Sequence, residues 1–116
     1  MTTSRETGAE SPELRRLRER IDKLDRRIVE LLNERAELAR AVGGEKLRLG
    51  RRAIRDADRE REVLLRVSIA NEGPMPQADL LAIYRRLIAA ARALEARERD
   101  RFRRDAPDPS GEPPSA

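Results

Sequence analysis

Five charged residues lie on or beside the apolar stripes of this sequence, at positions where burial alone would favour leucine. They are Arg18, Arg35, Lys46, Glu60 and Glu95. An unpaired charge in an apolar interior costs on the order of several kcal/mol, so each needs a partner. That partner can be another side chain, as in an Arg35–Glu60 ion pair, or the charge can fix the pairing of a coiled coil. Because the five occur on three predicted helices, we favour a charged pocket for a negatively charged ligand.

The residue types that are absent restrict the chemistry of such a pocket. The sequence has no histidine and no cysteine, which removes the most common metal ligands, general base and nucleophile. Within residues 11–104 the only serines are Ser11 and Ser68, and no threonine follows Thr7. The sequence therefore predicts no metal site and no covalent mechanism. An enzyme built from these residues would bind, orient and stabilise charge with arginine, lysine and carboxylates.

The composition is typical of a chain made of long helices. Of the 116 residues, 41% are charged and 2% are aromatic. Strands usually contain more aromatic residues, so we predict an all-α fold. The 26 basic and 22 acidic residues give a net charge of +4, but they are interleaved as on solvated helix faces. Because stacking aromatics are also scarce, we expect no nucleic-acid partner.

The sequence also bears on location. No apolar run reaches the length of a membrane-spanning helix, so we expect no membrane association. The first residues, MTTSRETGAESPE, lack the apolar core of a signal peptide. Without cysteine there is no disulfide framework to suggest export. The predicted location is the cytoplasm.

The first predicted helix is too long for a small globule. It begins at Ser11, a good N-cap followed by proline and glutamate, and continues to about Leu47 although the Gly43-Gly44 pair weakens it. Such a helix is about 54 Å long, whereas a globule of this size is only about 30 Å across. It cannot bury its apolar stripe within its own chain. We therefore predict a partner, most simply a second copy of the chain.

The rest of the chain predicts two further helices. After the first helix we predict a loop, a second helix, a break and a third helix, over residues 47–55, 56–71, 71–76 and 77 to beyond 99. The ends of the chain are rich in proline, glycine, serine and acidic residues, which predicts disorder. We therefore expect disordered tails at 1–10 and 105–116 around one helical domain at 11–104.

Three motifs have a specific spacing. LRERIDKLDRRIVELLNER follows the pattern LRxxIDxLDxxIxxLLxxR, Lys46 lies eleven residues after its final arginine, and RDADRE follows RDxxRE. Together they resemble the all-α chorismate mutase family over about residues 14–98. The resemblance implies a free-standing, intertwined homodimer of three-helix protomers, with two pockets that each draw residues from both chains. It also implies the rearrangement of chorismate to prephenate without a cofactor.

The resemblance also implies roles for the charged residues. Arg18 of the partner chain and Arg35 are expected to clamp the two carboxylates of the substrate, since arginine binds a carboxylate through two parallel hydrogen bonds. The clamps would fold the substrate into a reactive chair. Lys46 is expected to donate to the ether oxygen, where negative charge develops as the C–O bond breaks.

The RDxxRE motif is implied to serve the other end of the substrate. Glu60 and the backbone at Asp56 are expected to bind the ring hydroxyl, and Arg59 is expected to support the pocket. A carboxylate would accept a hydrogen bond from an amine as well as from a hydroxyl. The spacing therefore leaves open a mutase of 4-amino-4-deoxychorismate, which uses the same scaffold.

Two positions depart from the pattern of many family members. Ala91 stands where many have a serine that contacts a carboxylate, so one polar contact to the substrate is missing. Glu95 stands where many have a glutamine that donates to the ether oxygen, although some members also carry glutamate there. A carboxyl group donates a hydrogen bond only when protonated. We therefore expect activity to rise towards mildly acidic pH.

Two other kinds of function fit parts of this sequence pattern. Isochorismate–pyruvate lyases share the scaffold, but the intact RDxxRE motif and the full second helix favour a mutase. A non-catalytic helical interaction module would have an apolar stripe without converging charges, which is not the pattern here. Tails that dock a partner enzyme are a further alternative to simple disorder.

Overall fold

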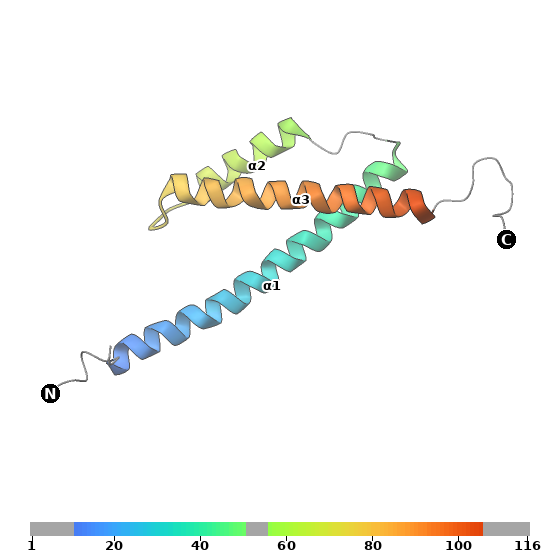
Figure 1. Cartoon of the computed structure of the whole chain (residues 1–116). Coiled ribbons are helices and arrows are strands. Elements are labelled where there is room, and N and C mark those ends of the chain that lie inside the picture. The colour runs from blue at the N-terminus through green and yellow to red at the C-terminus, as the bar shows by residue number, and fades with distance from the viewer. Residues whose placement is uncertain (1–10, 51–55, 106–116) are drawn as a thin grey trace, which may run out of the picture. The chain divides into compact units, whose positions relative to one another are not determined.

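The structure is a computed structural model that describes residues 11–50 and 56–105 (Figure 1). Within these residues there are three α-helices and no strand: α1 is Pro12–Arg48, α2 is Ala57–Ala70 and α3 is Gln77–Asp105. The predicted all-α fold is confirmed. Of the predicted tails at 1–10 and 105–116, only Asp105 is described, and it ends α3 instead of being disordered. Of the predicted loop at 47–55, residues 47 and 48 belong to α1, and residues 51–55 lie outside the described residues. No described helix is long and apolar enough to span a membrane.

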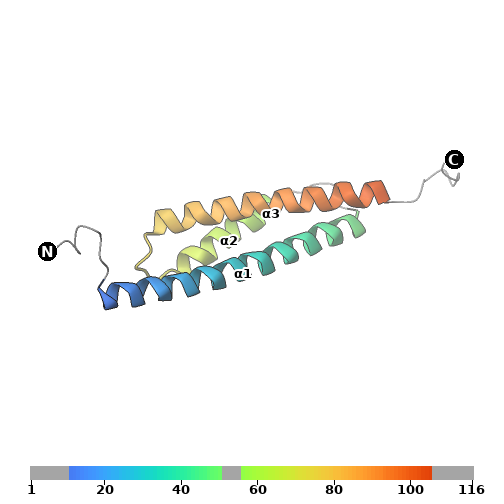
Figure 2. The same ribbon diagram turned by 60° about the horizontal axis from the view of Figure 1, so that its bottom comes forward.

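Helix α1 is uninterrupted (Figure 2), although the chain divides after Arg35 into two compact units. Ser11 caps the helix as predicted, because its Oγ accepts a hydrogen bond from the Leu14 backbone N–H at 3.0 Å. In the same turn Glu13 favours the positive end of the helix dipole and forms an ion pair with Arg16 at 2.7 Å. The glycine pair does not end the helix.

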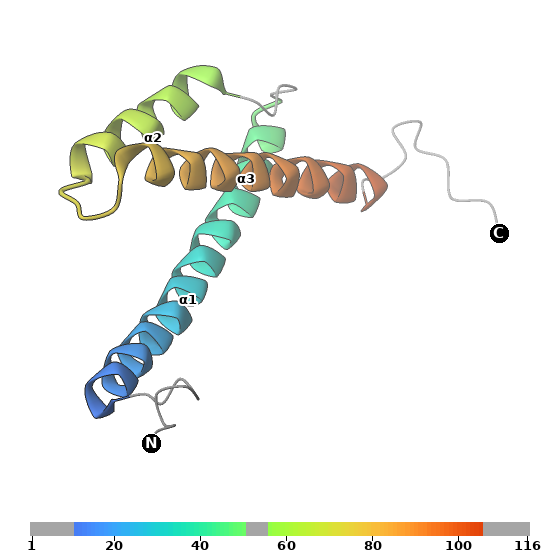
Figure 3. The same ribbon diagram turned by 60° about the vertical axis from the view of Figure 1, so that its left-hand side comes forward.

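In the second unit, which begins at Ala36, helix α2 packs against α3 (Figure 1 and Figure 3). Helix α2 starts where its sequence provides an N-cap. The Asp56 carboxylate accepts a hydrogen bond from the Arg59 backbone N–H at 3.0 Å, which satisfies one of the free donors of the first turn. This cap fixes the first turn of α2, and with it the position of Glu60.

The turn between α2 and α3 is organised by Asn71. Its Nδ2 donates to the Met75 carbonyl at 3.0 Å, and its Oδ1 accepts from the Gly73 N–H at 3.0 Å. Gly73 has a φ of +77°, a conformation that glycine adopts without the steric penalty of a side chain. Gln77 closes the turn by donating from Nε2 to the Ser68 carbonyl at 3.2 Å. These bonds hold the end of α2 beside the start of α3.

Helices α1 and α3 approach each other at Gly43. A Cβ atom built on Gly43 would lie 2.9 Å from Cα and 3.2 Å from the carbonyl oxygen of Glu95, closer than packed atoms normally come. A Cβ on Gly44 would meet nothing within 4 Å. The sequence suggested that both glycines weaken the helix. The structure gives them different roles, because Gly43 permits close contact between two backbones.

The apolar stripe of α1 is exposed in the single chain. Its large apolar side chains are between 38% and 68% exposed: Leu14, Leu17, Ile21, Leu24, Ile28, Leu31, Leu38 and Val42. Among the described residues, Ile88 on α3 is the one large apolar residue that is buried, at 8% exposure. This exposure is consistent with the length argument, which requires a partner for the first helix.

The two glycines provide a matched pair of variants. We expect Gly43→Ala to lower the free energy of unfolding by about 1–3 kcal/mol, because the new methyl group meets the α3 backbone, which cannot rotate away. Gly44→Ala should raise it by up to about 1 kcal/mol, because alanine favours the helix and meets no atom. Urea unfolding at one fixed protein concentration measures both values. Equal effects of the two substitutions would contradict the close approach at Gly43.

Candidate active site

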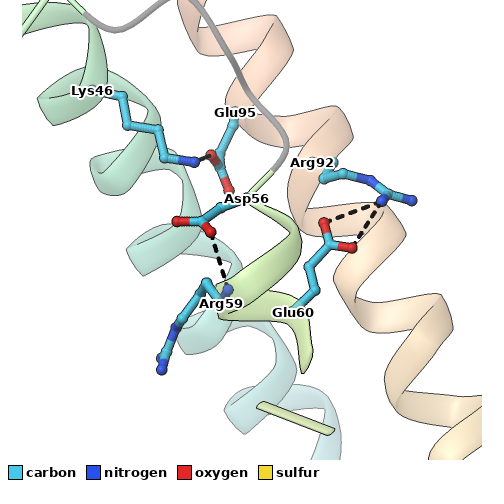
Figure 4. A network of polar contacts seen from close by, with 6 residues as sticks. All are labelled: Lys46, Asp56, Arg59, Glu60, Arg92 and Glu95. Atoms are coloured by element: carbon cyan, nitrogen blue, oxygen red, sulfur yellow. Dashed lines mark hydrogen bonds and ion pairs between the residues drawn. The ribbon is translucent and has the colours of Figure 1, made fainter. Parts of the chain in front are cut away.

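Lys46 and Glu95 form a buried ion pair between α1 and α3 (Figure 4). Lys46 Nζ donates to Glu95 Oε1 at 2.7 Å, and the two residues are 9% and 8% exposed. Lys46 lies in the last turn of α1, three residues after Gly43. The close approach at Gly43 brings the backbone of Glu95 next to α1, and this places the two side chains within hydrogen-bonding distance.

This pair has the chemistry needed to stabilise a developing negative charge. A cation with several N–H donors, held away from water, favours negative charge on a neighbouring oxygen far more than it would in solution. Glu95 accepts a hydrogen bond from Lys46 and thereby holds the ammonium group in place. The structure thus brings together two of the residues selected from the sequence.

Glu60 contacts Arg92, a residue that the sequence analysis did not select. Arg92 Nη1 donates to both carboxylate oxygens of Glu60, at 3.2 Å and 3.1 Å (Figure 4). Glu60 is in the first turn of α2 and Arg92 is on α3, so the contact joins the two helices. Both residues line a pocket of about 260 Å³, whose other lining residues are Ala57, Arg61, Leu64, Arg85 and Ile88.

Arg92 was missed because no local pattern connects it with Glu60, which lies 32 residues earlier in the sequence. It is also one of 26 basic residues, most of which lie in interleaved, exposed stretches. One signal was available. Arg92 is four residues after Ile88 and three before Glu95, so it shares a helix face with two buried residues.

Asp56 and Arg59 make contacts of their own at the start of α2. The Asp56 carboxylate caps α2 through the backbone N–H of Arg59. The Arg59 side chain is 57% exposed and forms an ion pair with Glu62, one turn further along α2. Figure 4 shows it pointing away from Glu60 and Arg92. The expected roles of the Asp56 backbone and of Arg59 therefore stay predictions.

The remaining predicted residues lie on α1 and α3. Arg18 and Arg35 belong to the first unit, where Arg18 is exposed and Arg35 is half-buried. Ala91 is half-buried on α3. The predicted ligand roles of these three residues stay predictions.

A second pocket, of about 430 Å³, has a largely basic lining. Its residues are Arg40, Leu94, Arg97, Glu98, Asp100, Arg101 and Arg104.

Two exposed ion pairs on α1 shift the pKa of one of their members. Arg40 Nη1 donates to Glu37 Oε1 at 2.9 Å, and this hydrogen bond, together with the charge of Glu37, raises the pKa of the Arg40 guanidinium above its ordinary value. In the last turn of α1 a hydrogen bond from Arg48 similarly lowers the pKa of the Glu45 carboxyl. Neither the Arg40–Glu37 pair nor the Arg48–Glu45 pair contains a residue that was selected from the sequence.

The comparison with known proteins decides the family. Residues 17–96 match the chorismate mutase type II family. The chain belongs to this family. The family inferred from the three sequence motifs is therefore confirmed.

Several curated relatives are bifunctional chorismate mutase/prephenate dehydratases. The one from Aquifex aeolicus is 40% identical over 87 residues, which are 72% of this chain and 24% of the relative. The one from Neisseria gonorrhoeae is 37% identical over 78 residues, 67% of this chain and 21% of the relative. The one from Escherichia coli K12 is 53% identical over 51 residues, 44% of this chain and 13% of the relative. The chain thus spans a quarter or less of these relatives.

The Lys46–Glu95 pair predicts a strong energetic coupling. Lys46→Met or Glu95→Met alone should lower the free energy of unfolding by about 3 kcal/mol, because each leaves a buried charge without its partner. The double variant should lose much less than the sum of the two. Urea unfolding of the four proteins measures the coupling. The exposed pair Glu45–Arg48 serves as a control for which we expect almost no coupling. Additive losses at Lys46 and Glu95 would contradict a functioning buried pair.

Proposed function

We propose that the chain catalyses the rearrangement of chorismate to prephenate, a step in phenylalanine and tyrosine biosynthesis. The observation that supports this most directly is the buried ammonium of Lys46, held by Glu95 in a member of the chorismate mutase type II family. In keeping with the sequence-based expectation, we also propose a cytoplasmic location.

The proposed reaction suits the available residue types. One C–O bond of the enol ether breaks and one C–C bond forms within the same molecule, so no atom is gained or lost. No nucleophile or cofactor takes part in these bond changes. As the C–O bond lengthens, negative charge grows on the ether oxygen, and Lys46 stabilises that charge more in the transition state than in the bound substrate.

Arginine residues supply the binding energy in this proposal. Arg35 and Arg18 of the partner subunit clamp the two carboxylates and hold the flexible substrate in a chair, which brings the reacting carbons together. At the other end, Glu60 and the Asp56 backbone bind the ring hydroxyl, and Arg59 supports this region. Ala91 contributes surface without a polar contact.

We further propose a homodimer with shared sites. The apolar stripe of α1 is exposed by at least 38% at every large side chain named above, and it needs a matching apolar surface. A second α1 helix presents the same stripe, so a two-fold axis would bury both at once. This arrangement also supplies Arg18 from the partner subunit.

The first test is direct turnover. The protein should convert chorismate to prephenate, followed by ultraviolet absorbance and identified by NMR. Arg35→Ala should lower kcat/KM by on the order of 100-fold or more, because a carboxylate clamp is lost. Arg16→Ala is the matched control, since Arg16 is an exposed arginine of the same helix, and it should leave turnover unchanged. Turnover of only the 4-amino analogue, or release of pyruvate, would contradict the proposed substrate or reaction. No turnover of any of these compounds would favour an interaction module.

The same approach tests the shared site. Arg18→Ala and Arg35→Ala proteins should each be nearly inactive as homodimers. After mixing and subunit exchange, half of the dimers are mixed, and each mixed dimer has one intact site. Activity should therefore return to about a quarter of the wild-type value. A mixture that stays as inactive as its components would contradict a site built from two subunits.

Glu95 is proposed to act at the ether oxygen together with Lys46. Its carboxylate holds the Lys46 ammonium group through the contact of 2.7 Å at Oε1. A glutamine at this place would donate a hydrogen bond to that oxygen itself.

A further inference from the structure

Glu60 is held by a positive charge that belongs to the protein. Arg92 Nη1 lies 3.2 Å and 3.1 Å from the two carboxylate oxygens, and the side chains of Glu60 and Arg92 are 16% and 33% exposed. The contact is thus partly shielded from solvent. In such a place charges interact more strongly than at an open surface. Any ligand group that binds Glu60 also meets the field of Arg92.

Several arginines line the pocket beside this ion pair, and Arg92 contacts Glu60 directly. Arg61, Arg85 and Arg92 line a volume of about 260 Å³ together with one carboxylate, Glu60. Arg61 also forms an ion pair with Asp58, one turn earlier on α2. Ala57, Leu64 and Ile88 provide the apolar part of the wall. The side-chain charges of this lining therefore sum to a net positive value, although it contains the carboxylate that is to bind the substrate.

This arrangement treats a hydroxyl and an amine differently. A neutral hydroxyl donates a hydrogen bond to Glu60 without any conflict with Arg92. An aliphatic amine is a cation at neutral pH and has to approach the same carboxylate against the charge of the guanidinium. Glu60 alone would accept from either group, so the discrimination comes from Arg92.

We propose that Arg92 is a specificity-determining residue, which acts through Glu60 to select a ring hydroxyl over a ring amine. The inference rests on the proposed function, because it takes Glu60 as the residue that binds the ring substituent. It deepens that function by assigning the choice between chorismate and 4-amino-4-deoxychorismate to one ion pair between α2 and α3. In this proposal Arg92 acts on the substrate indirectly, by changing which groups Glu60 binds.

The experiment compares kcat/KM for the two substrates on the same protein preparation. The wild type should prefer chorismate, and Arg92→Met should reduce that preference by about tenfold or more, because the competing cation is gone. Arg92→Lys should retain most of it. Arg85→Met is the matched control, since it removes an equal charge from the lining of the same pocket, two turns earlier on α3, and it should change the preference little. Partial misfolding of a variant lowers both rates equally, so the ratio stays informative.

The outcomes separate the two proposals. Wild-type turnover of chorismate with an unchanged ratio in Arg92→Met would overturn the role of Arg92 and leave the proposed function standing. An equal loss with both substrates would mean that Arg92 binds a group they share, such as a carboxylate, and would also overturn the specificity role. If Arg85→Met changed the ratio of the two kcat/KM values as much as Arg92→Met does, the effect would come from the overall charge of the pocket. That result would contradict a specific role of the Arg92–Glu60 ion pair. Absence of wild-type turnover would overturn the proposed function and the inference with it.

Discussion

The close approach of two helix backbones at Gly43 is the constraint on which the arrangement of the second unit depends. Because Gly43 has no side chain, the backbone of Glu95 can lie against α1. At this separation Lys46, one turn further along, reaches the Glu95 carboxylate at 2.7 Å. A bulkier residue would push α3 outward and leave two buried charges apart, which is far less favourable than either the pair or an apolar contact.

Helix α3 connects the charged groups of the second unit. Through Glu95 it pairs with α1, and through Arg92 it pairs with Glu60 on α2. Among the described residues Ile88 is the one buried large apolar residue, so these ion pairs do much to set the positions of the helices. Ion pairs add little net stability compared with apolar packing, but they favour one arrangement over others. The large apolar surface of α1 remains exposed in the single chain. Burying it against a second chain would supply most of the stabilisation of a dimer.

The sequence predicted the helices better than the contacts between them. Apolar periodicity and the predicted cap at Ser11 placed the ends of α1 and α2 within a residue or so, because these signals are local. The cap at Asp56 was recognised only in the structure. Lys46 and Glu95 were selected because a charge interrupts an apolar stripe, but their direct contact spans 49 residues and left no local signal. The same holds for Arg92. Gly43 was interpreted only as a weak point of the helix, because the need for close approach is visible only when the facing backbone is known.

The contact at Gly43 also bears on how such a protein can change over evolutionary time. The atoms that exclude a side chain at position 43 are the Cα, Cβ and carbonyl oxygen of residue 95, which nearly every amino acid possesses. Because these atoms remain whatever the residue at position 95, a substitution there cannot make room for a larger residue at position 43. A second mutation at position 95 therefore cannot compensate for a larger side chain at position 43. Position 95 itself is under no such restriction. The end of its side chain can change from a carboxylate to an amide without moving α3. The group that meets a ligand can therefore change during evolution while the crossing of α1 and α3 stays the same.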